Sequence, residues 1–186
     1  MSEHYKLRLA AHCLRAGGIV AYPTEAVWGL GCDPDADRAV EKILLLKQRD
    51  ISKGVILVAA HIDMLEPYLS QVSSQQRRRM LDTWPGPVTW LIPNTGVASH
   101  WISGGQKTLA VRVTAHPVAA ALSRTLGKPI VSTSANPQGL PPARNLTRVK
   151  AYFGDNIDAY APGQTGGANK PTEIRNLTTG EVIRPA

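Results

Sequence analysis

Cysteines, signal segments and long apolar runs are scarce in this chain. Its 186 residues include two cysteines, Cys13 and Cys32, and neither belongs to a Cys-x-x-Cys pair or to a Cys/His cluster with zinc spacing. Free thiols in a reducing compartment are therefore the expectation. The first residues lack the apolar core of a signal peptide, and no apolar run approaches the roughly 20 residues that span a membrane. We accordingly expect a cytoplasmic protein with no membrane partner.

Several catalytic signatures are missing as well. The sequence contains no Gly-x-Ser-x-Gly elbow, no His-Glu-x-x-His spacing among its five histidines, and no carboxylate pair typical of glycoside hydrolysis. Gly29-Leu30-Gly31 lacks the third glycine of a dinucleotide fingerprint, and the Gly-rich segment 163–171 lacks the Gly-Lys-Ser/Thr of a phosphate loop. We expect no metal held by protein side chains.

Cations, hydroxyls and apolar residues are what the chain does contain. Hydrophobic residues make up 43% of it, which is enough for one domain with a sizeable core. Lysine and arginine number 21 against 14 acidic residues, for a formal net charge of +7. That balance fits anionic partners such as a nucleotide or RNA, although solubility alone explains it equally well. A site rich in cations with few candidate bases suits transfer at a phosphorus centre.

Short apolar runs alternate with amphipathic stretches along the whole chain, and some of the apolar runs are placed to form hairpins. This pattern predicts an α/β fold, a single domain with a twisted, mixed β-sheet and flanking helices. Helices are expected over 5–16, from about 37 to 47, and over 61–69, 74–83, 116–126 and 146–153. Strands are expected over 18–22, 54–59, 88–92, 109–113 and 129–131, with a closing hairpin of 173–177 and 181–184. We expect 29–31 to be a turn and 163–171 to be a mobile loop.

Polar side chains follow three of the apolar segments, at the point where each segment ends. They belong to Pro23-Thr24-Glu25, Lys47-Gln48-Arg49 and Ser134-Ala135-Asn136. Ligands of open α/β sheets bind beyond the carboxyl ends of strands. If the fold brings these ends together, they form a cationic, hydroxyl-lined pocket for a nucleotide phosphate and a small acid.

Each of these signals has a plainer alternative when it is taken alone. Lys47 continues an apolar helical stripe, which is also the position of a lysine that reaches solvent from a last turn. Serine and asparagine are common in ordinary turns. Arg112 points to the opposite face from Val111 and Val113, toward either solvent or a cavity. The triple arginine 77–79 indicates a solvated helix face, with RNA phosphates as the alternative partner.

Taken in order, the motifs resemble the YrdC-like family, the threonylcarbamoyl-AMP synthases. The resemblance rests on Pro23-Thr24-Glu25 with Trp28 and Gly29-Leu30-Gly31, Lys47-x-Arg49, Ala110-Val111-Arg112-Val113 and Ser134-Ala135-Asn136. It covers essentially the whole chain and is nearest to the short bacterial form, which is the catalytic domain alone. The resemblance implies one YrdC-like domain over 1–186 without an additional C-terminal domain. It also implies a twisted open α/β sheet around a large basic cavity.

The resemblance implies a reaction in which L-threonine, bicarbonate or carbon dioxide, and ATP give threonylcarbamoyl-adenylate and pyrophosphate. Mg²⁺ is the implied companion of ATP. Other tRNA threonylcarbamoyl-transfer proteins would then move the group onto the adenosine beside the anticodon of tRNA. Direct binding of tRNA or double-stranded RNA is a further implied partnership.

Residue roles are carried over from the family position by position. The implied catalytic tetrad is Lys47, Arg49, Ser134 and Asn136. The implied ATP-binding residues are the same four with Lys53, Arg144 and Arg184. The implied threonine-binding residues are Thr24, Arg112, Ser132 and Thr172, with Arg112 on the carboxylate. Val58 departs from the pattern, because many relatives have a histidine there against the substrate.

Two other functions remain as alternatives. One is a non-catalytic RNA-binding or ribosome-maturation module, although a single phenylalanine and no RNP-like motif argue against a reader of single-stranded RNA. The other is a different ATP-dependent carbamoyl or acyl transferase on the same scaffold, which a test with other amino acids would separate.

Overall fold

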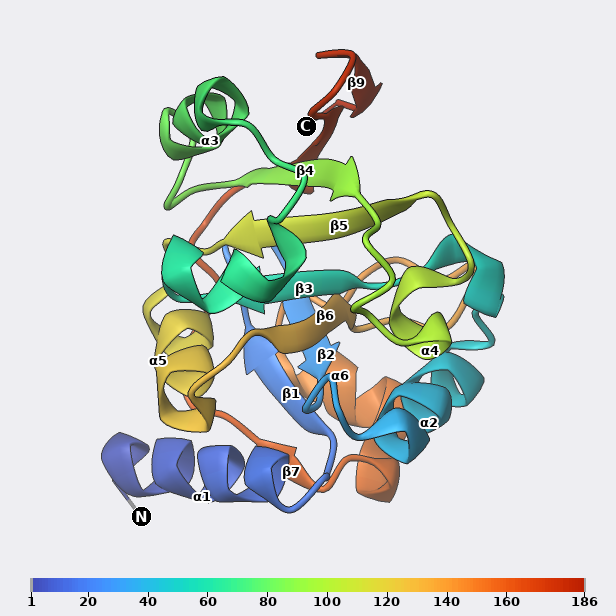
Figure 1. Ribbon diagram of the computed structural model, residues 1–186. Helices are drawn as coiled ribbons and strands as arrows, with labels where there is room; N and C mark the ends of the chain where they lie inside the picture. Colours follow the sequence, from blue (N-terminus) through green and yellow to red (C-terminus); the bar gives the residue numbers. More distant parts are fainter. Residues whose placement is uncertain (1, 186) are drawn as a thin grey trace.

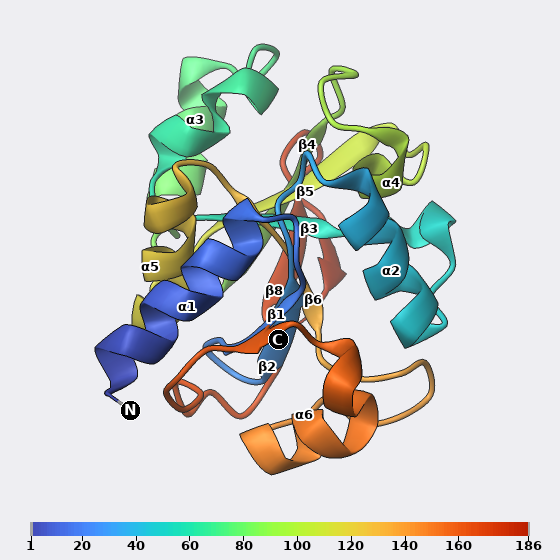
Figure 2. The same cartoon turned by 90° about the horizontal axis from the view of Figure 1, so that it is seen from below.

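A nine-stranded mixed sheet runs through the computed structural model, which describes residues 2–185, and helices lie on both of its sides (Figures 1 and 2). The strand order is β7-β1-β2-β6-β3-β5-β4-β8-β9. Neighbours β1 and β7, β3 and β5, and β4 and β8 pair in parallel, whereas the other neighbours are antiparallel. The predicted α/β class with a twisted mixed sheet is therefore confirmed.

The elements alternate along the chain much as the apolar pattern predicts. The strands are β1 (Val20–Pro23), β2 (Trp28–Gly31), β3 (Ile56–Ala59), β4 (Val88–Pro93), β5 (Thr108–Val113), β6 (Ile130–Ser134), β7 (Ala159–Tyr160), β8 (Glu173–Asn176) and β9 (Val182–Arg184). The α-helices are α1 (Glu3–Arg15), α2 (Asp37–Lys47), α3 (Ser74–Leu81), α4 (His100–Ser103), α5 (Pro117–Leu126) and α6 (Leu146–Phe153). Short 3₁₀ helices are η1 (Ile51–Lys53), η2 (Ile62–Tyr68) and η3 (Gly154–Asn156).

The turn expected at 29–31 is wrong, because these residues belong to strand β2. Leu30 pairs with Ala21 of β1 on one side and with Thr133 of β6 on the other. The glycine at 31 permits this double pairing. A Cβ there would lie 2.3 Å from the carbonyl oxygen of Val131 and 2.8 Å from the Tyr22 ring. Glycine in a strand here marks a close approach of neighbouring backbone.

Other differences from the sequence prediction have local causes. The segment expected to be a helix over 61–69 is the 3₁₀ helix η2, and it contains Pro67, which lacks the N–H that an α-helical turn uses. Strand β7 has only two residues, and helix α4 has four, so neither leaves a periodic signal in the sequence. Helix α3 begins at a capping box of Ser73 and Gln76 and ends at Leu81.

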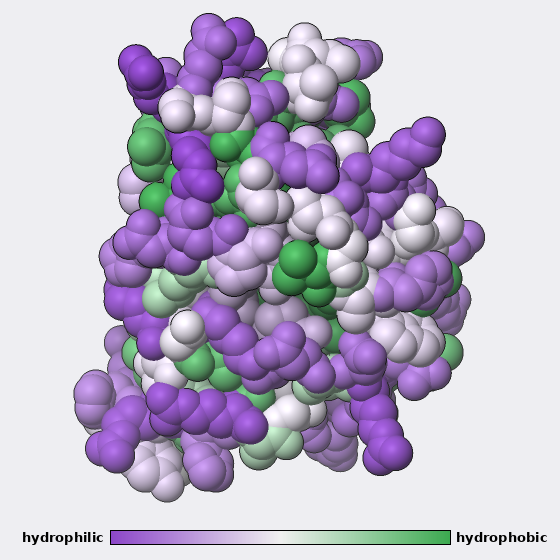
Figure 3. Space-filling view, in the orientation of Figure 1, coloured by the Kyte–Doolittle hydropathy of each residue, from purple (hydrophilic) through white to green (hydrophobic). Residues whose placement is uncertain are grey.

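Two apolar clusters pack against the two faces of the sheet. Leu57 and Val111 point into the larger cluster with Ile43 of α2, whereas Val58 points into the smaller one with Leu14 of α1 and Leu122 of α5. Helices α1 and α5 lie on one side of the sheet and α2 on the other (Figure 2). On the face shown in Figure 3, hydrophobic residues appear in small separate groups. Among the described residues, no helix combines the length and apolarity needed to cross a membrane.

Helices α1 and α5 cover only part of their side of the sheet. Val58 is fully buried there, yet Ile56, two residues earlier on the same strand and therefore on the same face, lines a cavity. Arg112 on β5 and Ser132 on β6 continue this uncovered region. The sheet thus leaves an open area beside the packed one, and the residues that the motifs singled out gather there.

Candidate active site

The main cavity of the described chain has a volume of about 610 Å³ and a strongly cationic wall. Its lining includes the cations Arg49, Lys53, Arg112, Arg144 and Arg184. Its hydroxyls come from Thr24, Ser132, Thr133, Ser134 and Thr172. Aspartate and glutamate are absent from this lining within residues 2–185. A cavity of this size accommodates a small-molecule ligand, and its charge selects an anionic one.

Strand alternation explains how separate segments supply this wall. Ala110 and Arg112 are two residues apart on β5, and Ser132 and Ser134 are two apart on β6, so each pair points to one face of the sheet. Strands β8 and β9 add Ile174 and Arg184. The carboxyl ends of the apolar runs do meet, as the sequence pattern requires for a shared pocket.

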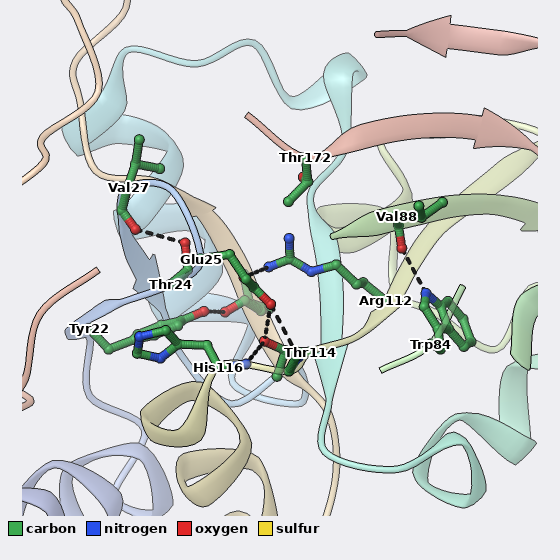
Figure 4. Close-up of polar contacts among 12 residues, drawn as sticks. Tyr22, Thr24, Glu25, Val27, Trp84, Val88, Arg112, Thr114, His116 and Thr172 are labelled. Carbon is green, nitrogen blue, oxygen red and sulfur yellow. Dashed lines mark hydrogen bonds and ion pairs between the residues drawn. The ribbon is translucent and has the colours of Figure 1, made fainter. Parts of the chain in front are cut away.

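Arg112 lies inside the protein and faces the cavity, which decides between its two predicted orientations. Only 4% of the residue is exposed. Its Nη2 atom forms an ion pair with Oε2 of Glu25 at 3.4 Å (Figure 4). A buried guanidinium is stable only when charged or polar partners offset the loss of water. Arg112 therefore presents a desolvated positive charge to any ligand in the cavity.

Arg49 and Arg184 extend the positive charge from Arg112 along the wall. The Arg49 guanidinium donates to the carbonyl oxygen of Gly54 from Nη2 at 3.0 Å and from Nε at 3.2 Å. Burial and the neighbouring Arg184 lower the pKa of Arg49. Burial and the neighbouring Arg112 lower the pKa of Arg184 in the same way. The three arginines thus disfavour one another's charge, and a bound anion would relieve that repulsion.

Lys47 is buried instead of reaching solvent, with 4% of the residue exposed. Its ammonium donates to the carbonyl oxygen of Ser134 and, at 2.6 Å, to that of Asn136. Burial and then the charge of Arg49 lower the pKa of Lys47 to about 7. The side chain does not line the cavity but lies behind the turn that follows β6. Lys47 thus holds the backbone that carries Ser134.

Asn136 likewise holds the same turn and does not face the cavity. Its Oδ1 accepts a hydrogen bond from Ser134 Oγ at 2.7 Å. Its Nδ2 donates to the carbonyl oxygens of Pro137 at 3.1 Å and Leu140 at 2.8 Å. The four residues of the predicted tetrad are therefore brought together, but only Arg49 and Ser134 among them line the cavity.

The segment 163–172 lies against the cavity and is tied to it by hydrogen bonds. Arg144 Nη2 donates to the carbonyl of Asn169 at 2.7 Å, and Arg184 Nη2 donates to that of Thr172 at 2.7 Å. The amide of Gly166 donates to the carbonyl of Thr24 at 3.0 Å. Two cavity cations therefore each donate one hydrogen bond to this segment.

The predicted site residues, apart from Lys47 and Asn136, all line the cavity. These are Thr24, Arg49, Lys53, Arg112, Ser132, Ser134, Arg144, Thr172 and Arg184. Val58, noted for its departure from the family pattern, is buried beside α5 and does not line it. Glu25 stands in the Pro23-Thr24-Glu25 motif, but the motif did not indicate a role for it. A carboxylate inside an apolar context is the signal that could have singled it out.

Comparison with known proteins decides the family. The model of the Sua5/YciO/YrdC family, described as "Telomere recombination", matches residues 12–186. The chain belongs to this family. The predicted YrdC-like membership is therefore confirmed over most of the sequence.

Curated Sua5/YciO/YrdC relatives match nearly end to end. A threonylcarbamoyl-AMP synthase of Cellvibrio japonicus is 54% identical over 181 residues, which are 97% of this chain and 96% of the relative. The proteins of the same name from Nitrosococcus oceani and Pseudomonas aeruginosa PAO1 are 52% and 47% identical and cover 97% and 100% of this chain. The alignments cover 98% and 100% of those two relatives.

Solved Sua5/YciO/YrdC structures share the fold. P. abyssi Sua5 complexed with L-threonine superposes with a TM-score of 0.91 at 31% identity, over 100% of this chain. The present chain spans 55% of that protein's length. E. coli YciO gives a TM-score of 0.85 at 26% identity and covers 98% of this chain and 89% of its own. These matches confirm the predicted sheet with flanking helices.

Proposed function

We propose that this chain is a threonylcarbamoyl-AMP synthase, which makes threonylcarbamoyl-adenylate and pyrophosphate from L-threonine, bicarbonate and ATP. Relatives of that name align with it almost end to end at 46–54% identity. The observation that carries the proposal is the cavity wall, which has five cations and no carboxylate among the described residues. Two anionic reactants must meet in this reaction, and such a wall offsets their repulsion.

We assign the residues of the wall to the two larger substrates. Arg49, Lys53, Arg144 and Arg184 are assigned to the phosphates and the rest of the nucleotide. Arg112, with the hydroxyls of Thr24, Ser132 and Thr172, is assigned to threonine. A guanidinium binds a carboxylate through two parallel hydrogen bonds, and hydroxyls pair with the amino acid's own hydroxyl. The buried position of Arg112 between two valines supports this assignment.

The chemistry needs no nucleophile from the protein. Bicarbonate takes up a proton and loses water to give carbon dioxide. The neutral amine of threonine attacks this carbon dioxide and forms a carbamate with release of a proton. A carbamate oxygen then attacks the α-phosphorus of ATP, and the bond to the β-phosphate oxygen breaks as pyrophosphate leaves. Arg49 and the Ser134 hydroxyl, which both line the cavity, would stabilise the charge that moves onto the phosphates. Lys47 and Asn136 are positioning residues in this proposal, because they hold the turn that presents Ser134.

Magnesium is expected to arrive with ATP. Among residues 2–185, no group of three His, Cys, Asp or Glu side chains could hold a metal ion. The oxygens in the cavity wall are hydroxyls and carbonyls, which fits an ion coordinated chiefly by phosphate oxygens and water. When bound, the ion supplies charge neutralisation at the phosphates. Ser132 and Ser134, which line the cavity, would contact its hydration shell.

We place the enzyme in the cytoplasm, upstream of proteins that transfer the threonylcarbamoyl group to tRNA. The alternative of a purely RNA-binding module is not favoured by any contact in the structure. Arg77, one of the three consecutive arginines, forms an ion pair with Glu66, which reduces the free positive charge on that helix.

One assay tests the function directly. The purified protein is incubated with ATP, Mg²⁺, L-threonine and labelled bicarbonate, and we expect a labelled adenylate together with pyrophosphate. Replacing threonine with serine should reduce turnover, because a methyl group removed from a fitted pocket costs about 1–3 kcal/mol. RNA binding with a steep salt dependence and no ATP turnover would instead support the RNA-binding module.

A further inference from the structure

The carboxylate of Glu25 lies at the centre of a buried polar cluster beside the cavity (Figure 4). The residue is 9% exposed, and its Oε1 atom accepts from Thr114 Oγ1 at 2.6 Å and from the amide of Ala115 at 3.2 Å. Its Oε2 atom faces Nη2 of Arg112 at 3.4 Å. Glu25 does not line the cavity. Its direct charged link to the cavity is Arg112, whose side chain lines the wall.

Unpartnered polar atoms are concentrated in this cluster. Across residues 2–185, five buried side-chain atoms lack a hydrogen-bond partner, and three of them are Oε2 of Glu25, Nε of Arg112 and Nδ1 of His116. Folded proteins leave few such atoms, and a group of them calls for an explanation in function. Within residues 2–185, the Arg112 guanidinium donates no hydrogen bond to another protein atom. The ion pair holds Nη2 on the Glu25 side, and the other terminal nitrogen points away from Glu25 toward Thr172 (Figure 4).

Glu25 also joins the three segments that carry the proposed threonine contacts. Glu25 directly follows Thr24 in the sequence. Its Oε1 accepts hydrogen bonds from the two residues that come directly after β5, the strand that carries Arg112. Its carbonyl oxygen accepts from the amide of Ala168 at 3.0 Å, in the loop that leads to Thr172. Glu25 is therefore linked to all three segments, and its carboxylate supplies the links to Arg112 and to the residues that follow β5.

We propose that Glu25 is the positioning residue of the threonine subsite, and that its carboxylate holds the Arg112 guanidinium with a free edge toward the cavity. One terminal nitrogen of Arg112 points toward Glu25 and the other toward Thr172 (Figure 4). Arg112 then binds the substrate carboxylate with its remaining donors. The inference rests on the proposed function, because it takes threonine as the ligand.

Charge repulsion between Glu25 and the substrate carboxylate would act in the opposite direction. Two features make orientation the stronger effect. Oε1 already accepts two hydrogen bonds, which spread its charge, and the adjacent guanidinium offsets the rest. Bidentate binding of a carboxylate depends on the angle of the guanidinium plane. Without Glu25, Arg112 would therefore lose more affinity from its freedom of orientation than it would gain from the weaker repulsion of the substrate.

The first test is Glu25→Gln, which removes the charge and keeps the shape. We expect the KM for threonine to rise about tenfold or more, with a change of less than about twofold in the KM for ATP. Calorimetric titration with L-threonine should show the same loss of affinity. Glu66→Gln is the matched control, because it also removes the acid of a Glu–Arg pair but lies outside the cavity lining. It should change neither constant.

A double-mutant cycle with Arg112→Ala tests the route of the effect. Arg112→Ala alone should raise the KM for threonine. Adding Glu25→Gln in that background should then change it by less than about twofold, because the two residues act as one unit. Full additivity of the two effects would overturn the proposal. An unchanged or lowered KM for threonine in Glu25→Gln would overturn it as well.

A milder variant covers the case in which Glu25→Gln does not fold. Thr114→Val removes the hydroxyl bound to Oε1 with little change of shape. A raised KM for threonine in this variant, with the melting temperature nearly unchanged, supports the positioning role. An unchanged KM contradicts it. Failure of the wild-type protein to make any adenylate would instead refute the proposed function, and binding of threonine measured by calorimetry would still decide the role of Glu25.

Discussion

At the scale of single residues, two cations that are neighbours in the sequence end in different surroundings. Helix α2 ends at Lys47, and Gln48 follows in a left-handed conformation with φ of 52°. The turn sends Lys47 into the protein, where it bonds to backbone carbonyls, and Arg49 into the cavity. The two residues of one motif therefore have separate tasks, one in holding the site and one in facing the ligand.

Arg49→Ala should abolish pyrophosphate release, with a loss of at least about 100-fold in kcat, because a charge-stabilising donor at the reacting phosphates is removed. The variant should remain folded, since the guanidinium bonds to exposed or partly buried carbonyls of Lys53 and Gly54 only. A pyrophosphate release assay and circular dichroism check both parts. Arg79→Ala, on the exposed face of α3, is the control and should retain activity. Wild-type turnover in Arg49→Ala would remove this residue from the catalytic assignment.

Lys47→Met should change how stability depends on pH. The folded protein has a Lys47 pKa of about 7 against an ordinary value of 10.5, so between these values the unfolded chain binds a proton that the folded chain does not. The free energy of unfolding of the wild type should therefore rise relative to the variant as pH increases from 7 toward 10.5. Below pH 7, the free energy of unfolding of the wild type is at its lowest relative to that of the variant. Urea unfolding of both proteins at pH 7 and pH 9.5 measures it, and parallel pH profiles would contradict a buried amine.

At the scale of secondary-structure elements, β2 shows how packing overrides local preference. Its two glycines suggest a turn, yet the strand lies between β1 and β6 and connects β1 and β7 to the rest of the sheet. Gly31 has backbone and ring atoms at its Cβ position, whereas Gly29 has ordinary contact distances of 3.4–3.5 Å. The same residue type thus serves two purposes within one strand.

Gly31→Ala should destabilise the protein by about 2–3 kcal/mol, because the added methyl group meets the Val131 carbonyl and must push β6 away. Gly29→Ala is the matched control in the same strand and should cost less than about 1 kcal/mol. Chemical denaturation of both variants provides the comparison. Equal effects at the two positions would mean that backbone approach is not what requires glycine at 31.

At the scale of the whole molecule, the net charge of +7 is not spread evenly with respect to function. Five cations face one cavity, while other basic residues are paired on the surface, as Lys128 is with Asp33 and Asp35. The cavity therefore concentrates positive potential where an anion binds. A rise in ionic strength should therefore weaken anion binding in the cavity more than it changes the stability of the fold.

Raising the salt concentration from 50 mM to 300 mM should weaken ATP binding by about tenfold and threonine binding much less. ATP carries several negative charges, whereas threonine has no net charge at neutral pH, and the screening length falls from roughly 14 Å to roughly 6 Å. Isothermal titration of each ligand at both salt concentrations tests this. An equal salt effect on both ligands would contradict the assignment of the arginines to the phosphates.

The pattern of apolar runs was sufficient to predict most of the helices and strands, including the closing hairpin, because burial on one or two faces leaves a period in the sequence. It was also sufficient to single out the polar ends that meet at the cavity. The pattern did not predict strand β2 with its two glycines, the two-residue strand β7 or the 3₁₀ conformation of η2. Their conformation depends on neighbouring chain segments and not on their own residues.

The amino-acid sequence by itself determined the alternation of elements and the chemical character of the site, since hydrophobic periodicity and residue type are local properties. Only the tertiary structure decided which cations reach the cavity, because that depends on the direction of each side chain after packing. In the folded protein, Lys47 is buried behind a turn and Arg112 points inward. Glu25, in the connection between β1 and β2, lies against Arg112. These are relations between residues far apart along the chain, and no local pattern encodes them.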